Sequence, residues 1–539
     1  MYLTDNDLKD RLKWEKAGFT LPAYNRDLMK EKTKENPSWV HFGAGNIFRA
    51  FHAVLAEKLL NEGFLDTGIV VAEGFDTEII EKAYKPFDDL SILVTLKSDG
   101  SVEKRVTGAV ASSLVLDSAL PDFEELKEIF KKKSLKLATF TITEKGYKLT
   151  GADENYTGQV AADFEAGPDK PVSYIGKVTA LLYERFKAGA LPVAMVSTDN
   201  CSHNGEKLFT AVRTFAEKWT EKGVCEKGFI DYVTDENKVS FPWSMIDKIT
   251  PRPDDSVREI LCKDGLYDME TRITHFNTYV APFVNAEECE YLVIEDKFPN
   301  GRPELEKVGV IFTNRDTVNK VERMKVTTCL NPLHTALAVY GCLLGFTRIS
   351  DEMKDADLVN LIKRLGYVEG LPVVTDPGVL VPKEFIDTVV NVRLPNPFMP
   401  DTPQRIATDT SQKLSIRFGE TIKCYIAAGR KVTELTAIPL VLAGWLRYTM
   451  GIDDNGNEFT CSPDPLLNEV KNYTDRFSVG NVPDAKEVNT VLEPLYKKKE
   501  IYGIDLCEAG ISDKVTEYFI SLLRGKGMIR ETIKNVVSQ

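Results

Sequence analysis

The stretch Ser38-Trp-Val-His-Phe-Gly-Ala-Gly-Asn-Ile-Phe-Arg49 predicts a strand, a glycine turn and the start of a helix. Gly43 and Gly45 match the first two glycines of the dinucleotide-binding fingerprint: one permits the tight turn, and the other lets the backbone approach a pyrophosphate. The third glycine of that fingerprint is replaced by Phe48. A single Gly-x-Gly is weak evidence, so the interpretation depends on the segments that follow it.

The next predicted strand, residues 68–76, contains two carboxylates near its end, Glu73 and Asp76. An acidic side chain at this position is typical of NAD-binding domains, where it binds the ribose 2′-hydroxyl. No Lys or Arg follows until Lys82, so a 2′-phosphate would meet no nearby cation. The pattern favours NAD over NADP, with a solvated strand end as the alternative for either carboxylate.

The remaining pattern predicts the fold class. Apolar strands alternate with helices along the first half of the chain, which indicates a parallel, doubly wound sheet of the Rossmann type. After about residue 285 the pattern changes to successive helices. We therefore predict a dinucleotide-binding α/β domain over residues 1–285, with an outer N-terminal extension over residues 1–36, and a mostly α-helical substrate domain over residues 286–539. The further predicted strands are 91–96, 135–143 and 191–198, and the predicted helices include 122–132, 173–187, 206–222 and 314–346.

Composition excludes several classes of function. The 539 residues carry a net charge of −13, which argues against a nucleic-acid or membrane-surface partner. The nine cysteines form no CxxC pair and the five histidines no ligand spacing, so neither a disulfide framework nor a metal site is predicted. The N-terminus has no basic and apolar regions of a signal peptide, and we expect a cytoplasmic protein. It should be a monomer or a small homo-oligomer with a small-molecule substrate.

A second stretch, Lys325-Val-Thr-Thr-Cys-Leu-Asn-Pro-Leu-His334, brings an amine, a carboxamide and an imidazole together. A Lys that loses its proton in a desolvated site is a general base, and a neighbouring Asn can donate a hydrogen bond to a developing alkoxide. Glu322 lies three residues before Lys325 and can share a helix face with it. The alternative is an ordinary helix start, with Asn331 as N-cap and Pro332 at the first helical position.

Several motifs occur in order along the chain. They are 41–49 (HFGAGNIFR), 141–147 (TITEKGY), 197–200 (STDN) with Asn204-Gly205, 244–251 (SMIDKITP), the stretch 325–334, and Arg393, Asn396-Pro397, Arg405-Ile406, Asp409 and Ser411-Gln-Lys413. In this order they resemble the polyol-specific long-chain dehydrogenase/reductase family, and the resemblance covers residues 38 to 450.

The resemblance implies a metal-independent, NAD-dependent oxidoreductase in which a lysine is the acid/base. Lys325 would be that group, Asn200 and Asn331 would polarise the carbonyl oxygen, and His334 would orient the substrate. Glu322 would pass the proton between Lys325 and solvent. The substrate would be bound by Asp247, Arg405 and Lys413. The cofactor would be bound by Gly43, Ala44, Gly45, Asn46, Phe48, Arg49, Glu73, Asp76 and Glu144.

The chain departs from the family pattern at one place. In the family four residues separate the Lys from the Asn, whereas five separate Lys325 from Asn331. The extra residue can be absorbed as a π-bulge, a feature that is frequent at functional sites. Alternatively, Lys325 ends one helix and Pro332 starts the next.

The substrate expected from the resemblance is a hexuronate, with D-fructuronate and D-mannonate interconverted. The alternatives are the fructose/mannitol and tagaturonate activities of the same family, and a catalytically silent sugar-acid sensor. The preference rests on overall likeness and on additional cations, Lys248 and Arg252, of which Arg252 could grip a carboxylate through two parallel hydrogen bonds. A competing motif, Tyr183-x-x-x-Lys187, has the spacing of short-chain dehydrogenases, but its helix looks like an ordinary amphipathic one.

Overall fold

The computed structural model describes residues 1–538 and divides into two compact units. The first comprises Met1–Lys97 and Ser101–Asn319, and the second comprises Ser98–Gly100 and Lys320–Gln539. This division lies later than the predicted boundary near residue 285. The reason is strand pairing, because β13 (Phe283–Glu287) pairs with β4 (Ser91–Leu96), and β14 (Tyr291–Glu295) pairs with β10 (Ser244–Asp247).

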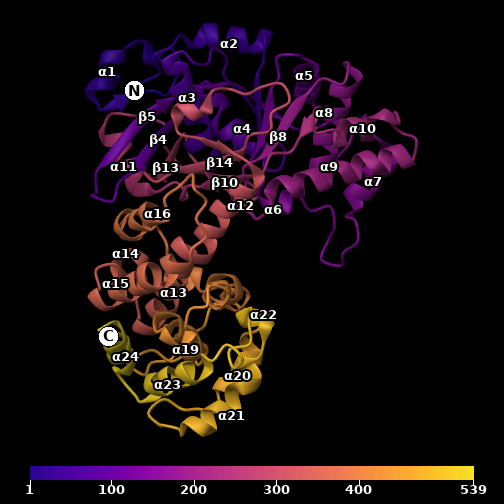
Figure 1. The fold of residues 1–539 in the computed structure, drawn as a ribbon. Coiled ribbons are helices and arrows are strands. Elements are labelled where there is room, and N and C mark those ends of the chain that lie inside the picture. Colours follow the sequence, from indigo (N-terminus) through magenta and orange to yellow (C-terminus); the bar gives the residue numbers. More distant parts are fainter. Residues whose placement is uncertain (539) are drawn as a thin grey trace. The chain divides into compact units, whose positions relative to one another are not determined.

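A six-stranded parallel sheet forms the centre of the first unit, which is coloured indigo to pink in Figure 1. Its order is β6-β3-β2-β7-β8-β9, so counted along the chain the strands follow 3-2-1-4-5-6, the order of dinucleotide-binding sheets. The predicted fold class is therefore present. The strands are β2 (Trp39–Phe42), β3 (Ile69–Glu73), β6 (Val110–Val115), β7 (Leu137–Phe140), β8 (Val193–Ser197) and β9 (Val239–Ser240).

Helices cover both faces of this sheet, and the residues of β2 show how the two cores arise. Val40 and Phe42 point into one hydrophobic cluster, whereas Trp39 points into the other, because successive side chains of a strand alternate between faces. The helices of this unit are α1 (Arg11–Lys16), α2 (Arg26–Glu35), α3 (Ala53–Glu62), α4 (Glu78–Ala83), α5 (Pro121–Phe130), α6 (Thr143–Gly146), α7 (Gly158–Ala166), α8 (Tyr174–Lys187), α9 (Asn204–Glu221), α10 (Gly228–Thr234) and α11 (Asp255–Lys263).

Three smaller sheets flank the central one, and they correct one prediction. The strand predicted at residues 91–96 exists as β4, but it lies outside the parallel sheet and pairs antiparallel with β5 (Val102–Thr107). A short turn over residues 97–101 joins the two strands, so no crossover helix can intervene. The additional sheets are β1 (Phe19–Thr20), β5, β4 and β13; β10, β14 and β15 (Ile311–Thr313); and β11 (Arg272–Ile273) with β12 (Tyr279–Val280).

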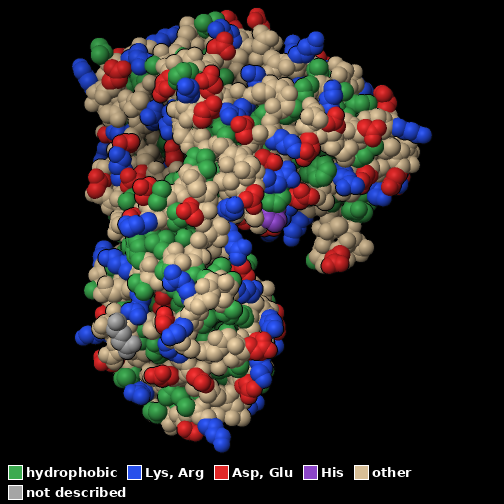
Figure 2. All heavy atoms as spheres, in the orientation of Figure 1, with side chains coloured by type: hydrophobic (Ala, Val, Ile, Leu, Met, Phe, Trp, Pro, Cys, Tyr) green, Lys and Arg blue, Asp and Glu red, His purple; other side chains and the backbone are tan. Residues whose placement is uncertain are grey.

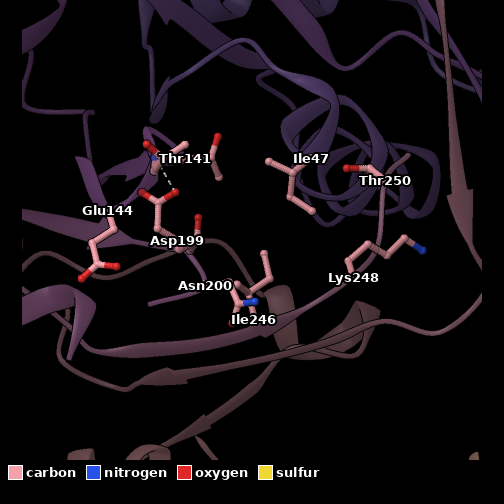
Figure 3. A pocket seen from close by; sticks show the side chains of 10 residues that line it. Ile47, Thr141, Glu144, Asp199, Asn200, Ile246, Lys248 and Thr250 are labelled. Atoms are coloured by element: carbon pink, nitrogen blue, oxygen red, sulfur yellow. Dashed lines mark hydrogen bonds between the residues drawn. The ribbon is translucent and has the colours of Figure 1, made fainter. Parts of the chain in front are cut away.

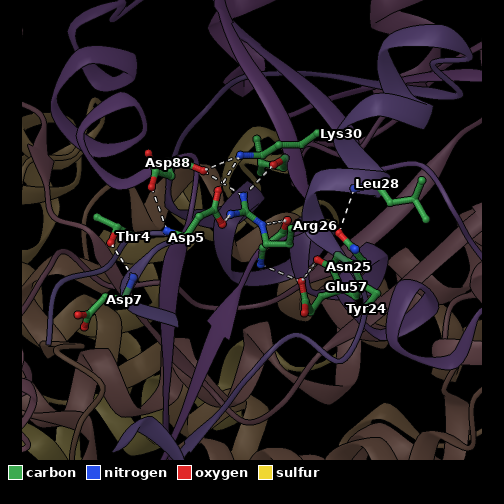
Figure 4. A network of polar contacts seen from close by, with 12 residues as sticks. Thr4, Asp5, Asp7, Tyr24, Asn25, Arg26, Leu28, Lys30, Glu57 and Asp88 are labelled. Carbon is green, nitrogen blue, oxygen red and sulfur yellow. Dashed lines mark hydrogen bonds and ion pairs between the residues drawn. The ribbon is translucent and has the colours of Figure 1, made fainter. Parts of the chain in front are cut away.

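The N-terminal extension is anchored in the first unit rather than laid on its outside. Arg26 is 8% exposed, donates to the Gly108 carbonyl at 3.0 Å and forms an ion pair with Asp5. Glu57 accepts hydrogen bonds from the Tyr24 hydroxyl at 2.7 Å and from the Gly108 amide at 2.8 Å (Figure 4). Burial raises the pKa of Glu57 to about 7.

The second unit is mostly helical, as predicted from the sequence. Helices α13 and α19 form its centre, since nearly all of their residues are buried and they pack against each other. Its helices, from salmon to yellow in Figure 1, are α12 (Arg315–Met324, which spans the division), α13 (Asn331–Leu344), α14 (Ile349–Glu352), α15 (Ala356–Lys363), α16 (Pro382–Thr388), α17 (Pro403–Ile406), α18 (Glu420–Ala427), α19 (Ala437–Thr449), α20 (Leu467–Thr474), α21 (Ala485–Tyr496), α22 (Lys499–Tyr502), α23 (Ser512–Leu523) and α24 (Met528–Val537).

Both units contain π-helical turns, which are rare in proteins and occur often at functional sites. In the first unit, one such turn directly precedes α3 and begins at Phe48, the residue that replaces the third glycine of the fingerprint. The second unit has one that begins at Lys325. The π-helical turns are η2 (Phe48–His52), η5 (Lys325–Cys329), η6 (Arg364–Gly370), η8 (Val389–Arg393) and η10 (Ser415–Gly419).

The face shown in Figure 2 carries acidic and basic side chains interspersed. Over residues 1–538, none of the helices combines the length and the apolar character that crossing a bilayer requires. All nine cysteines have free thiols.

Candidate active site

The glycine turn after β2 has the geometry of a dinucleotide-binding turn. Gly43 has φ +105°, and a Cβ placed there would lie 2.2 Å from the Thr141 carbonyl oxygen. A Cβ at Gly45 would have nothing within 4 Å. Gly43 is therefore required for the turn itself, whereas Gly45 keeps one side of the turn open.

These two glycines give a matched pair of variants. We expect Gly43→Ala to destabilise the protein by about 2 kcal/mol or more, because it combines a left-handed backbone with a backbone clash. Gly45→Ala should leave the melting temperature unchanged and raise the KM for NADH roughly tenfold, because its methyl group occupies the space that the cofactor needs. Thermal unfolding and steady-state kinetics of both variants check this. An unchanged KM in Gly45→Ala would contradict the assignment of the turn.

The two carboxylates after the second strand of the sheet are buried at its carboxyl end. Glu73 is 6% exposed and accepts hydrogen bonds from the amides of Ala44 at 2.7 Å and Phe75 at 2.8 Å. Burial raises its pKa. Asp76 is 2% exposed and accepts the Thr274 hydroxyl at 2.6 Å. Glu73 thus ties β3 to the glycine turn, and the contact of either carboxylate with a ribose stays a prediction.

Phe48 and Arg49, directly after the glycine turn, have buried side chains. Phe48 is fully buried and stacks on His41 with ring centroids 4.2 Å apart. Arg49 is 1% exposed and donates to the Ala281 carbonyl at 2.6 Å and to the Asn46 side chain at 2.8 Å. Both side chains are buried and engaged within the protein, and their contact with a cofactor stays a prediction.

A cavity of about 290 Å³ opens at the carboxyl ends of the parallel strands, where ligands of such sheets bind. Its lining includes two residues predicted for the site, Asn200, which is exposed, and Glu144 (Figure 3). Glu144 is ion-paired with Lys207 at 2.9 Å, and this contact lowers the Glu144 pKa. The full lining is Ile47, Thr141, Thr143, Glu144, Thr198, Asp199, Asn200, Ile246, Lys248 and Thr250.

Asp199 organises this cavity and was not singled out from the sequence. Its carboxylate accepts the amides of Ile142 at 3.0 Å and Thr143 at 2.8 Å, and it also accepts the Tyr147 hydroxyl. These bonds fasten the loop after β7 to the end of β8. The only sequence signal was its position in the Ser-Thr-Asp-Asn motif, directly before Asn200.

Asn204 brings two of the quoted motifs together. Its amide nitrogen donates to the carbonyls of Asp199 and Ser244, both at 3.0 Å, and its amide oxygen accepts the amides of Gly205 at 2.8 Å and Ser244 at 3.0 Å. The start of β10 is thereby fixed beside the end of β8. Asp247, at the other end of β10, is 5% exposed.

The two additional cations of the first unit have other partners. Lys248 is ion-paired with Glu290 at 3.0 Å and extends away from Asn200 in Figure 3. Arg252 is exposed and its guanidinium lies over the Tyr279 ring, 4.7 Å from the centroid. Lys248 lines the cavity, as a cation near the site would, but its charge is compensated by Glu290.

In the second unit, the extra residue between Lys325 and Asn331 is accommodated by a π-helical turn. The Leu330 amide donates to the Lys325 carbonyl at 3.1 Å, which is the i to i−5 pattern of a π-helix. A new helix, α13, then begins at Asn331 with Pro332 in its first turn. The two alternatives considered from the sequence, a π-bulge and a new helix that starts at Pro332, are therefore both present in part. Lys325 is 4% exposed, as a desolvated acid/base requires.

His334 lies among charged groups of the second unit. Its Nε2 is 3.5 Å from Oδ2 of Asp401. The pKa of His334 is lowered to about 4, mainly by desolvation and also by the guanidinium groups of Arg417, Arg393 and Arg405, while Asp401 opposes the shift. The imidazole is therefore neutral at neutral pH.

The other predicted residues of this unit are placed as follows. Arg405 forms an ion pair with Asp401. Lys413 donates to the Ile406 carbonyl at 3.2 Å, and desolvation lowers its pKa. Glu322 is half-buried on α12, three residues before Lys325.

The competing short-chain motif has a structural role. The Tyr183 ring belongs to the hydrophobic core and packs edge-on against Phe229 with centroids 5.1 Å apart. Lys187 lies over that ring and pairs with Glu184 at 2.8 Å. Tyr183 is not among the residues that line the cavity at the strand ends. In residues 1–538, no group of three or more His, Cys, Asp or Glu side chains is arranged to hold a metal ion.

Comparison with known proteins identifies the family. The mannitol dehydrogenase Rossmann domain matches residues 37–307, and the mannitol dehydrogenase C-terminal domain matches residues 317–522. The chain is 51% identical to D-mannonate oxidoreductase of Thermotoga maritima over 100% of this chain and 99% of that protein. It is 28% identical to D-mannonate oxidoreductase of Escherichia coli, over 82% of this chain and 87% of that protein.

Solved structures agree. Mannitol 2-dehydrogenase of Pseudomonas fluorescens, in a ternary complex with NAD and D-mannitol, superposes with a TM-score of 0.68 at 26% identity and full coverage of both chains. A D-sorbitol dehydrogenase gives 0.75 at 25% identity, covering 94% of this chain and 99% of that one. The predicted fold class and the prediction of an NAD-dependent oxidoreductase are confirmed. The chain belongs to the mannitol dehydrogenase family.

Proposed function

We propose that the protein interconverts D-fructuronate and D-mannonate with NAD(H) as the hydride carrier. The 51% identity to a D-mannonate oxidoreductase over the full chain supports this substrate. The observation in the structure that carries it is the group of guanidinium side chains around His334: Arg393, Arg405 and Arg417. In a protein of net charge −13, such a local excess of cations is what an anionic sugar acid requires.

The chemistry assigned to the second unit is proton transfer at the substrate oxygen. When bound, the nicotinamide accepts or supplies the hydride. Lys325, buried at the start of η5, gives a proton to the carbonyl oxygen during reduction and takes it back during oxidation. Asn331 of this unit donates a hydrogen bond to that oxygen, and Asn200 of the first unit keeps its predicted role as a hydrogen-bond donor to a substrate carbonyl. Glu322 passes the proton between Lys325 and solvent.

The remaining residues bind the sugar chain. A neutral His334 can both donate and accept a hydrogen bond, which suits a hydroxyl group better than a carboxylate. Asp247, Arg405 and Lys413 contact further hydroxyls.

The cofactor residues lie on the first unit. The turn from Gly43 to Asn46 takes the pyrophosphate. Glu73 and Asp76 take the adenosine ribose, and Glu144 lines the cavity beside Asn200. The buried carboxylates at the end of β3 disfavour a 2′-phosphate, so NADH should be preferred to NADPH.

A substrate panel tests the proposal. D-fructuronate, D-tagaturonate and D-fructose are reduced separately with NADH and with NADPH, and kcat/KM is measured for each. We expect the highest value for D-fructuronate with NADH. A higher value for D-fructose would identify a mannitol 2-dehydrogenase, and a higher value for D-tagaturonate a tagaturonate reductase. Absence of turnover with every substrate would favour a silent sugar-acid sensor.

A further inference from the structure

Arg417 is a desolvated cation that has no carboxylate partner within residues 1–538. It lies on η10, and its guanidinium donates to the Thr335 hydroxyl. That hydroxyl donates in turn to the Asn331 carbonyl at 2.8 Å. Within residues 1–538 the Thr335 oxygen is the one side-chain acceptor that the guanidinium meets, although an arginine has five N–H donors. Desolvation lowers the Arg417 pKa to about 10.

Arg417 lies close to the residues of the second unit that we propose for catalysis. Thr335 directly follows His334 and lies one helical turn after Asn331 on α13. The turn η10 also packs against η5, which begins at Lys325. A guanidinium at this position faces the same stretch of α13 that provides Asn331 and His334. Arg417 is half-buried, and even partial burial of a charge without a counter-ion is costly unless an anion binds there.

We propose that Arg417 binds the carboxylate of the sugar-acid substrate and thereby sets the preference for a uronate over a neutral ketose. The inference rests on the proposed function and names the group that recognises the charge. A guanidinium fits this task because it can hold a carboxylate through two parallel hydrogen bonds.

The other cations of the predicted site are less suited. Arg405 already pairs with Asp401, and Lys413 is held by the carbonyls of Ile406 and Thr408. Arg252 is exposed over the Tyr279 ring. Arg417 is desolvated and meets no carboxylate among the described residues, so its positive charge is the one that a bound anion would neutralise.

The test compares charged and neutral substrates in Arg417→Gln, whose amide can still donate to Thr335. With NADH, kcat/KM for D-fructuronate should fall roughly 10- to 100-fold, the range for hydrogen bonds to a charged group. Reduction of D-fructose should change less than about threefold. Arg417→Lys, which keeps the charge but not the forked geometry, should show a smaller selective loss, and it replaces the first variant if that one does not fold.

Arg364→Gln is the matched control. Arg364 likewise lies on a π-helical turn of the second unit, and its guanidinium also donates to a threonine hydroxyl, that of Thr436, at 2.5 Å. This variant should reduce both substrates as the unmodified protein does. Equal losses on both substrates in Arg417→Gln would show that Arg417 only positions Asn331 through Thr335, and would overturn the inference.

A second outcome also overturns it. If Arg252→Ala loses activity selectively on D-fructuronate while Arg417→Gln does not, Arg252 is the carboxylate ligand. The proposed function is contradicted by a different result, namely a higher kcat/KM of the unmodified protein for D-fructose than for D-fructuronate. The two results are therefore distinguishable in one set of measurements.

Discussion

Lys325→Ala is expected to lower kcat for D-fructuronate reduction by about 10²–10⁴-fold while the Kd for NADH stays nearly unchanged. The loss follows from removing the group that protonates the substrate oxygen. The retained NADH affinity follows from the position of the cofactor turn on β2 and α3, in the other unit. Single-turnover kinetics measure the chemical step, and fluorescence titration measures the binding of NADH.

Two control variants separate this role from its alternatives. Lys354→Ala removes an exposed lysine of the same unit, 73% exposed at its side chain, and should leave kcat unchanged. Tyr183→Phe removes the hydroxyl of the competing short-chain motif and should also leave kcat unchanged, because that ring packs in the core. Near-normal turnover in Lys325→Ala together with an inactive Tyr183→Phe would reverse the assignment.

Two strands of the parallel sheet were not predicted, because β6 contains two serines and is only partly buried, and β9 has only two residues. The other four, β2, β3, β7 and β8, were predicted because each is a short apolar run that is buried on both faces. Such a run does not reveal its partners. The strand at residues 91–96 was therefore placed in the parallel sheet, whereas a short turn folds it back on β5. The later division between the units has the same origin, since β13 and β14 pair with strands far earlier in the chain.

The site was predictable where its residues are close in sequence. Lys325, Asn331 and His334 fall within ten residues of one another, and their spacing indicated a shared site. Arg417 was missed because it meets Thr335 across 82 residues of chain. Asp401 was missed for a similar reason, since only the fold brings it within 3.5 Å of His334. Contacts of this kind depend on helix packing, which no local spacing specifies.

Glu352 is a buried carboxyl group that the proposed chemistry does not use. It is fully buried at the end of α14, and neither carboxyl oxygen has a hydrogen-bond partner in residues 1–538. It lies against Gly341 of α13, where a Cβ would be 2.2 Å from Oε1. Burial, with a smaller effect of the nearby Asp355, raises the pKa of Glu352 to about 10. The folded protein therefore holds Glu352 protonated at neutral pH.

The sign of the resulting pH dependence is fixed by the raised pKa. Below the ordinary glutamate value both states bind the proton and stability is highest. Between that value and a folded pKa of about 10, only the folded state binds it. In this range the contribution of Glu352 to the free energy of unfolding should fall by about 1.4 kcal/mol for each unit that the pH rises. Between the ordinary glutamate pKa and pH 7 the total loss is about 3 kcal/mol.

Glu352→Met should therefore stabilise the protein by about 3 kcal/mol at pH 7, with a gain that grows as the pH rises. Methionine has nearly the same length and no polar group to leave unpaired, and its flexibility lets it fit beside Gly341. Urea unfolding at pH 6, 7 and 8 measures the gain and its slope. Glu517→Met, a change of an exposed glutamate on α23, is the control and should show neither the gain nor its pH dependence.

A gain that does not change with pH would mean that Glu352 is ionised in the folded protein and that its carboxylate has a compensating partner. A loss of stability would mean that the carboxyl group itself supports the packing of α14 on α13.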